Sequence, residues 1–329
     1  MSGVRASSRD ERRGVIGIDL GATKTAAGLV SADGTVMAFG SWPTRAGDGP
    51  GGLLAQLAAV VNDMVAEARA LALEVVGVGL ATPGIVDAAS GVIRYATPAL
   101  PGWTGLRLSA SLAASVALPV VVHNDGQATA QGEWVVGAAA GCTDALVVTV
   151  GTGVGGGIIA GGRLLLGHEG SAGRIGHLSV DADGRWCWCG ARGCVEQYVS
   201  GTAIARDAQT VLAGGVETTL RQLARPVVAA DVVAAARAGD GVARSLLVTA
   251  GSYLGAALTS LVNVLSPEVV VIAGGLAEAG TLLIEPAEAV LRERLPAVLS
   301  SGLAIRLSAL GPRAAVAGAA LLAWEQLAG

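Results

Sequence analysis

Three cysteines and one histidine form the most chemically distinctive group in this chain. They follow the spacing His-x9-Cys-x-Cys-x4-Cys, in a sequence of 329 residues with only four cysteines and three histidines. The four residues are His177, Cys187, Cys189 and Cys194. Three thiolates and one imidazole are the ligand set of a closed, tetrahedral structural zinc site. The spacing therefore favours a zinc loop over residues 177–194.

Two other interpretations of the cysteines compete with metal binding. One is a disulfide or redox pair, and the other is a set of unrelated buried thiols. The sequence shows no cleavable secretory signal, which counts against a structural disulfide. The fourth cysteine, Cys142, stands apart and is expected to be a small core residue.

A glycine-containing motif near the start of the chain has the composition of a phosphate-binding hairpin. It reads DLGATK over residues 19–24 and follows an apolar run. Gly21 lets the backbone approach a phosphate, while Thr23 and Lys24 add hydrogen bonds and positive charge. Asp19, at the end of a predicted strand, is suited to hold Mg²⁺ directly or through water. An ordinary hairpin is the alternative.

Two further glycine motifs follow predicted strands. The sequence GTGVGGG covers 151–157, and a second strand is expected after it, so it lacks the helix that opens a dinucleotide-binding fingerprint. We interpret it as a phosphate-binding hairpin, because five glycines in seven residues destabilise a chain unless its backbone must pass close to something. Gly274 and Gly275 follow another buried strand and are suited to receive adenosine, or simply to form a tight strand-to-helix turn.

Asn124 and Asp125 lie where a predicted strand meets a predicted helix. A carboxylate at that place can accept a proton from a substrate hydroxyl, which is the general-base role in phosphoryl transfer. The neighbouring Asn can hold adjacent hydroxyls. By themselves the two residues are more typical of a helix cap.

The elements that must position these residues alternate between strands and helices. Apolar runs predict strands at 15–19, 25–30, 36–42, 75–81, 120–123, 144–150, 155–159, 269–273 and 304–308. Helical periodicity predicts helices at 53–71, 106–115, 126–136, 201–213, 228–239, 242–265, 282–295 and 314–327. A strand–glycine loop–strand hairpin thus occurs twice, which predicts paired α/β domains with a ligand between them.

Composition limits the partners that the chain can bind. Hydrophobic residues make up 52% of the sequence, charged residues 15%, and the net charge is −4. A weakly acidic chain gives no support to nucleic-acid or anionic-membrane binding. The apolar run 246–267 is long enough to span a membrane, but its polar residues favour a buried helix. We therefore expect a cytoplasmic protein.

Taken together and in order, these motifs resemble the ROK family of sugar kinases and repressors, which belongs to the hexokinase–actin–Hsp70 superfamily. The resemblance runs from about residue 14 to the last predicted helix. It is most specific at DLGATK (19–24), ND (124–125), GTGVGGG (151–157), the cysteine–histidine group and GARGCVEQY (190–198). The last of these segments is similar to the bacterial glucokinases of the family.

The resemblance implies an α/β protein with a two-domain, actin-like ATPase (ribonuclease H-like) fold and an interdomain cleft. We expect a disordered tail at 1–13, an N-terminal α/β domain at 14–125, and a C-terminal α/β domain at 126–313 that carries the zinc loop. The final helix, 314–327, is expected to pack back on the first domain.

The resemblance also implies roles for individual residues. Asp125 would be the catalytic base for the sugar 6-hydroxyl, and Asn124 and Asp125 would bind hydroxyls at that end of the sugar. Gly84 would offer its backbone to the sugar, while His177 and Glu196 would lie at the reducing end. Zinc would shape this pocket without performing chemistry. The ATP and Mg²⁺ residues would be Asp19, Gly21, Thr23, Lys24, Gly151, Thr152, Gly153, Gly155, Gly274 and Gly275.

The sequence departs from the family pattern on the substrate side. Arg174 stands where the family usually has a sugar-binding Glu, and Ala99 where it often has Asn. A carboxylate accepts hydrogen bonds from hydroxyls, whereas a guanidinium only donates them and carries the opposite charge. Arg174 can turn away or pair with Glu196, can recognise a modified ring, or can mark a degenerate pocket.

We therefore expect an ATP-dependent kinase that phosphorylates the primary hydroxyl of a hexose such as glucose. A kinase for a modified sugar or C7-cyclitol is the alternative that Arg174 suggests. A sugar-responsive repressor is disfavoured, because only about a dozen residues precede the first predicted strand, which is too few for a DNA-binding domain. A homo-oligomer, dimer or tetramer, is expected from the family.

Overall fold

The computed structural model describes residues 12–327, whose contacts group them into two compact units. Unit 1 comprises the described parts of Met1–Cys142, Gly157–Gly173 and Ala309–Gly329. Unit 2 comprises Thr143–Gly156 and Arg174–Ser308. Each unit contains its own sheet and its own helices.

The strands and helices alternate along much of the chain. The strands are β1 Arg13–Leu20, β2 Lys24–Val30, β3 Val36–Pro43, β4 Glu74–Thr82, β5 Ile85–Asp87, β6 Val92–Tyr95, β7 Val120–Asn124, β8 Ala145–Val150, β9 Val154–Ile159, β10 Val269–Ala273 and β11 Ala304–Leu307. The helices are α1 Gly49–Ala70, α2 Leu108–Val116, α3 Asp125–Val136, α4 Glu196–Val199, α5 Gly201–Ala213, α6 Ala229–Arg237, α7 Gly241–Leu265, α8 Thr281–Arg294, α9 Ala297–Ser300 and α10 Ala314–Leu327.

The main sheet of unit 1 has five strands in the order β3-β2-β1-β4-β7. The first three strands form an antiparallel meander, while β4 and β7 run parallel to β1. The β1–β2 turn is the glycine motif at 19–24, and the parallel strands are separated by α1 and α2, as parallel connections require. The carboxyl ends of β1, β4 and β7 therefore meet at one edge of the sheet.

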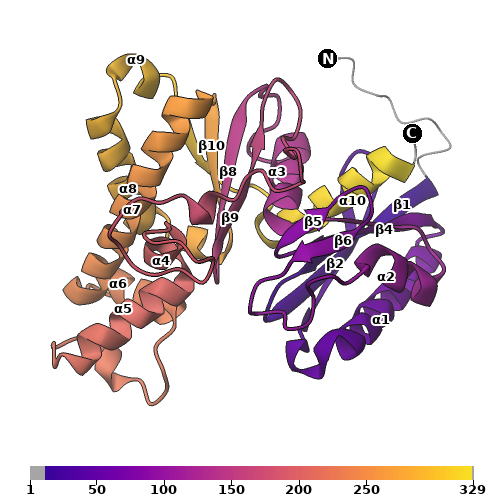
Figure 1. The fold of residues 1–329 in the computed structure, drawn as a ribbon, viewed down its shortest axis with the longest axis horizontal. Helices are drawn as coiled ribbons and strands as arrows, with labels where there is room; N and C mark the ends of the chain where they lie inside the picture. The colour runs from indigo at the N-terminus through magenta and orange to yellow at the C-terminus, as the bar shows by residue number, and fades with distance from the viewer. Residues whose placement is uncertain (1–11, 328–329) are drawn as a thin grey trace. The chain divides into compact units, whose positions relative to one another are not determined.

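Helices cover both faces of this sheet. Helices α1 and α2 lie on one side of the sheet and α10 on the other (Figure 1). Alternate β1 residues such as Ile16 and Ile18 share a buried cluster with α1 and α2, whereas Val15 packs with Val316 of α10. This alternation follows from the two-residue period of a strand. Gly17 and Gly79 lie under α10, where an added Cβ would overlap helix carbonyls, so these glycines allow α10 to pack closely on β1 and β4.

A four-stranded sheet in the order β11-β10-β8-β9 supplies unit 2 with β8, β10, β11 and the first half of β9, Val154–Gly156. Strand β10 lies between β8 and β11 and is parallel to both, and all five of its residues are buried. Its helices include the long pair α7 and α8, which run side by side (Figure 1). The parallel pairing of β8 and β10 brings the loops that follow both strands to the same edge.

Among the described residues, α7 is the one helix long and apolar enough to cross a membrane by length and composition. Half of the residues in its most apolar window are buried. Its buried residues include Leu247, Leu254 and Leu258, and it packs on α5, α6 and α8. Such packing is typical of a core helix.

The predicted element order is confirmed, with most ends shifted by one or two residues. The short hairpin of β5 and β6 was missed, as were α4 and α9. Most of the predicted tail lies outside the described residues, and Arg13, which was placed in that tail, begins β1. Helix α3 belongs to unit 1, although the sequence assigned 126 onward to the second domain. Compact units are not shown to fold independently, so the domain boundaries and the interdomain cleft stay predictions.

Candidate active site and metal centre

The carboxyl edge of the unit 1 sheet gathers the acidic candidates. The parallel register places Asp19 of β1 beside Ala81 of β4, and Ala81 beside His123 of β7. Asn124 and Asp125 follow directly at the end of β7. Ligands of open α/β sheets bind at the carboxyl ends of the strands, so these side chains occupy the edge where chemistry is expected.

Asn124 both caps a helix and positions the neighbouring carboxylate. Its Oδ1 accepts hydrogen bonds from the backbone N–H groups of Gly126 (2.9 Å) and Gln127 (3.2 Å), which caps α3. Its Nδ2 donates to the carbonyl of Gly84 and to Oδ1 of Asp125, each at 2.9 Å. The cap interpretation of the sequence is therefore correct for Asn124, and the same amide orients Asp125.

Asp19 lies close enough to Asp125 for their charges to interact. Burial, and after it the negative charge of Asp125, raise the pKa of Asp19 to about 7, while the positive charge of Lys24 opposes both effects. Without a cation, Asp19 is therefore only partly ionised near neutral pH. A divalent cation would relieve the repulsion between the two carboxylates, and carboxylate oxygens are the ligands that Mg²⁺ prefers.

The turn between β1 and β2 is held by backbone hydrogen bonds and by Thr44. Gly21 N–H donates to the Lys24 carbonyl (2.9 Å), and the Thr44 hydroxyl donates to the Gly21 carbonyl (2.8 Å). The Thr44 N–H donates to the Thr23 carbonyl at 3.0 Å. Thr23 and Lys24 are exposed. The sequence analysis missed Thr44, which the β2–β3 pairing could have indicated, because Lys24 lies opposite Pro43 in that hairpin.

The glycine loop of unit 2 connects two neighbouring strands. It begins after Val150 at the end of β8, and β9 starts at Val154, so a strand follows it and the dinucleotide fingerprint is excluded as predicted. Gly151 N–H donates to the carbonyl of Gly153 (2.9 Å), which closes the turn. Thr152 lies within this turn and Gly155 lies in β9.

The third glycine motif adjoins this loop. Gly274 follows β10 at φ +88°, and an added Cβ there would lie 2.5 Å from the carbonyl oxygen of Val150. Gly275 begins a short 3-10 helix, Gly275–Ala279. The predicted tight turn is thus present, and it requires glycine both for its conformation and for its contact with the end of β8.

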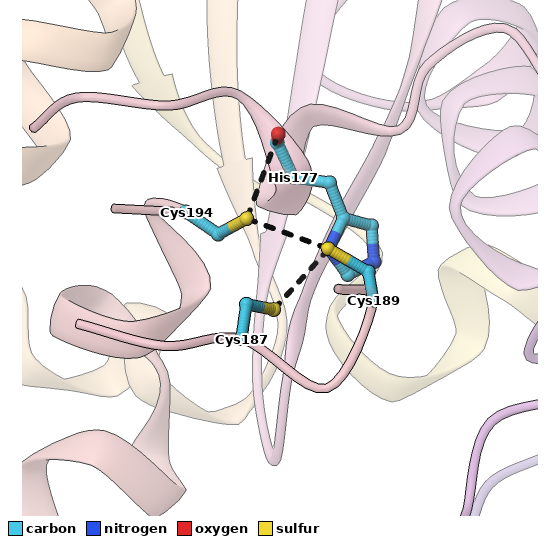
Figure 2. Close-up of side chains that lie close together, drawn as sticks. All are labelled: His177, Cys187, Cys189 and Cys194. Carbon is cyan, nitrogen blue, oxygen red and sulfur yellow. Dashed lines mark hydrogen bonds between the residues drawn. The ribbon is translucent and has the colours of Figure 1, made fainter. Parts of the chain in front are cut away.

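The cysteines and the histidine converge into one cluster (Figure 2). Their ligand atoms all lie within 4.8 Å of one another. Cys189 Sγ is 3.6 Å from Cys194 Sγ, and Cys187 Sγ is 3.7 Å from His177 Nδ1. A tetrahedral zinc ion with bonds of about 2.3 Å to sulfur and 2.0 Å to nitrogen needs edges of roughly 3.8 and 3.6 Å. The donor set and its spacing therefore fit zinc.

Protonation in this cluster follows from burial. Burial, followed by the charge of Arg174, lowers the pKa of His177 and favours the neutral imidazole that binds metal. Burial raises the pKa of the Cys187 and Cys194 thiols, and hydrogen bonds among the thiols add to the effect at Cys194. A bound cation would favour the thiolates.

Glu196 is held by hydrogen bonds rather than by an ion pair with Arg174. Its Oε2 accepts from the N–H of Val154 (3.0 Å), and its Oε1 accepts from Nε1 of Trp188 (2.7 Å). Across residues 12–327, no ion pair joins Glu196 to Arg174, which is half-buried. The sequence analysis missed Trp188, and its position between two metal-ligand cysteines was the signal that could have found it.

Comparison with protein families decides what this set of motifs belongs to. The model of the ROK family matches residues 15–326. The chain belongs to the ROK family. It is 34% identical over 321 residues to a glucokinase of Halalkalibacterium halodurans, covering 95% of this chain and 96% of the relative. It is 40% identical over 199 residues to an N-acetylmannosamine kinase of Escherichia fergusonii, covering 60% of this chain and 65% of that relative.

Solved structures show the same relationship. A ROK family glucokinase from Streptomyces griseus, in complex with glucose and AMPPNP, superposes with a TM-score of 0.77 and 32% identity, covering 93% of this chain and 98% of that one. The α/β architecture with mixed sheets and these ROK relatives fit an actin-like ATPase fold. The functions expected for individual residues of this ROK protein stay predictions.

The metal assignment predicts about one zinc ion per purified chain. Cys194→Ser should lose this zinc and lower the free energy of unfolding, because it removes a buried ligand of a closed site. Elemental analysis and thermal unfolding measure both effects. Cys142→Ser is the matched control and should retain the zinc. A folded, active wild-type chain without metal would refute the assignment.

Proposed function

We propose that this ATP-dependent sugar kinase transfers the γ-phosphoryl group of ATP to the primary (6-type) hydroxyl of a hexose such as glucose, with Asp125 as general base. The observation that carries the proposal is the position of Asp125 at the carboxyl edge of β7, where Asn124 orients it and Asp19 lies within electrostatic range. The sequence similarity to glucokinases supports the hexose.

Asp125 and its neighbours have distinct tasks in this proposal. Asp125 accepts the proton of the sugar hydroxyl, so that the oxygen can attack the γ-phosphorus. Asn124 orients Asp125 and binds the neighbouring hydroxyl. Asp19 holds Mg²⁺, which neutralises charge on the phosphates when it is bound. The carbonyl of Gly84 accepts a hydrogen bond from Asn124 Nδ2, and its N–H is offered to the sugar.

The nucleotide is bound through the glycine-rich elements. The turn with Gly21, Thr23 and Lys24 supplies backbone contacts, a hydroxyl and a positive charge for phosphate. The second loop supplies backbone contacts from Gly151, Thr152, Gly153 and Gly155. Gly275 leaves room for adenosine, because an added Cβ there would meet nothing within 4 Å, and Gly274 forms the tight turn beside Val150 that places it.

The metal-binding segment forms the wall for the reducing end of the sugar. His177 would hold zinc through Nδ1, the nitrogen near Cys187, and would present the other edge of its ring to the sugar. The Glu196 carboxylate accepts from Val154 and Trp188 and retains further lone pairs for sugar hydroxyls. Zinc holds this wall in place. Arg174, half-buried beside His177, adds donors where the family usually has an acceptor.

A specific observation favours a second candidate substrate. The charge of Arg174 is close enough to His177 to lower its pKa, and Arg174 forms no ion pair with Glu196 in the described part of the chain. A guanidinium in this position suits a ring with an added acceptor, such as a keto group. A modified sugar or C7-cyclitol is therefore the alternative substrate class.

The remaining expectations are secondary proposals. We propose a cytoplasmic homo-oligomer that acts on a small-molecule sugar. A sugar-responsive repressor is the less favoured function, because the orientation of Asp125 by Asn124 and its proximity to Asp19 serve catalysis rather than sensing alone.

Asp125→Asn should abolish phosphoryl transfer while leaving nucleotide binding largely unchanged. The substitution retains the shape of the side chain but removes the base, which typically contributes 10²- to 10⁴-fold, so kcat should fall by at least about 100-fold. Coupled ADP release and equilibrium binding of an ATP analogue measure the two properties. Asp63→Asn, on the exposed surface of α1, should match the wild type. Substantial kinase activity in Asp125→Asn would eliminate the base assignment.

A substrate panel separates the two substrate classes. Glucose, mannose, N-acetylated and amino hexoses, and C7-cyclitols are compared by ADP release for the wild type, Arg174→Glu and the exposed control Arg192→Glu. The main proposal expects the wild type to prefer a plain hexose. If the wild type instead prefers a cyclitol or modified hexose, and Arg174→Glu reverses this preference, the second substrate class is established. An unchanged preference in Arg174→Glu would show that Arg174 does not select the substrate.

A further inference from the structure

A continuous set of contacts connects the metal-binding cluster to the glycine loop within unit 2. Trp188 lies between Cys187 and Cys189, and its ring packs edge-on against His177, with centroids 4.8 Å apart and planes at 84°. Its indole Nε1–H donates to Oε1 of Glu196 at 2.7 Å. The conformation of the cysteine segment therefore fixes where the indole points, and the indole in turn holds one carboxylate oxygen.

The other oxygen of Glu196 reaches the glycine loop. Oε2 accepts from the N–H of Val154 at 3.0 Å, at the point where the loop enters β9. An added Cβ on Gly153 would lie 2.6 Å from this same oxygen. The carboxylate can approach the loop only because residue 153 has no side chain, and hydrogen bonds to an ionised acceptor are among the stronger ones.

Neighbouring contacts hold the rest of the loop. Gly201 N–H donates to the Gly151 carbonyl, and the Thr202 hydroxyl donates to the Thr152 carbonyl, both at 2.8 Å. These donors lie at the start of α5, which directly follows the short helix α4 that carries Glu196. Helix α5 thus holds the first half of the loop, and Glu196 holds the second half.

Helix α4 is itself anchored to the core of unit 2. Tyr198, two residues after Glu196, stacks on Tyr253 of α7 with ring centroids 4.0 Å apart and planes at 23°. Tyr198 is buried. The backbone of Glu196 is therefore fixed, so the direction of its carboxylate depends on the groups that donate to it, Trp188 and Val154.

We propose that Trp188 is a positioning residue that couples the closed metal cluster to the conformation of the glycine loop, acting through Glu196. When His177 and the cysteines hold the ion, Trp188 is kept against His177 and directs the carboxylate toward Val154. Opening of the cluster releases the indole, and the loop loses the hydrogen bond at its second half. The proposal rests on the proposed function, because it takes residues 151–157 to bind the phosphates of the nucleotide.

Trp188→Phe tests the coupling, because phenylalanine keeps an aromatic ring against His177 but removes the N–H donor. We expect this variant to retain about one zinc per chain. Hydrogen exchange in a peptide covering 151–157 should be faster than in the wild type. In the absence of sugar, the affinity for a non-hydrolysable ATP analogue should fall by about five- to tenfold. Trp186→Phe, an exposed tryptophan two residues earlier, is the matched control and should change none of the three.

Zinc removal and a second variant complete the experiment. Chelation of the wild type should accelerate exchange in 151–157 to the level of Trp188→Phe, and chelation of Trp188→Phe should add little. If Trp188→Phe or the chelated protein does not stay folded, Gly153→Ala provides the test: it displaces Glu196 from the loop without touching the cluster, and should accelerate loop exchange with zinc retained.

The outcomes separate failure of the coupling from failure of the proposed function. The coupling is overturned if Trp188→Phe matches Trp186→Phe in both hydrogen exchange of the loop and nucleotide affinity. It is also overturned if zinc removal leaves hydrogen exchange of the loop unchanged in a protein that stays folded. Faster loop exchange with unchanged nucleotide affinity would uphold the coupling and contradict the phosphate-binding role of the loop.

Discussion

Parallel backbone pairing of β1, β4 and β7 is the constraint on which the acidic part of the site depends. The register that sets Asp19 beside Ala81, and Ala81 beside His123, brings three strand ends to one edge of the unit 1 sheet. The charge of Asp125 can then add to the effect of burial in raising the pKa of Asp19, although the two residues lie more than one hundred positions apart in the sequence. A one-residue shift in this register would turn each of these side chains to the other face of the sheet.

Unit 2 uses the same constraint for a different purpose. The parallel pairing of β8 and β10 places Gly274 against the backbone of Val150, the residue before Gly151, and both glycines bring backbone rather than side chain to the edge. The metal-binding segment then adds what the sheet cannot supply, because Glu196 reaches the loop from a short helix outside the sheet. Each unit thus presents functional groups at the carboxyl ends of its parallel strands.

The sequence predicted the elements well where glycine or a turn follows a strongly apolar run. Val269–Ala273 and Ala314–Leu327 have the predicted bounds, whereas the β5–β6 hairpin, with three and four residues, is too short to show a period. The clustering of His177 with three cysteines was predictable, because their spacing is chemically restrictive. The contacts of Trp188 and Thr44 were not, because they depend on how irregular segments fold in space. For Asn124 the sequence offered a cap or a functional amide, and the structure shows one side chain that caps α3 and also orients Asp125.

The central claim is that the amide of Asn124 orients the base, beyond its role as a cap. Asn124→Ser tests this most directly, because Ser caps helices about as well as Asn but has no amide nitrogen to donate to Gly84 and Asp125. Thermal unfolding and the kcat for sugar phosphorylation are measured together on this variant. The account predicts a melting temperature close to that of the wild type and a kcat lower by more than about tenfold, since a misplaced base loses much of its effect. A wild-type kcat in a variant of unchanged stability would contradict it.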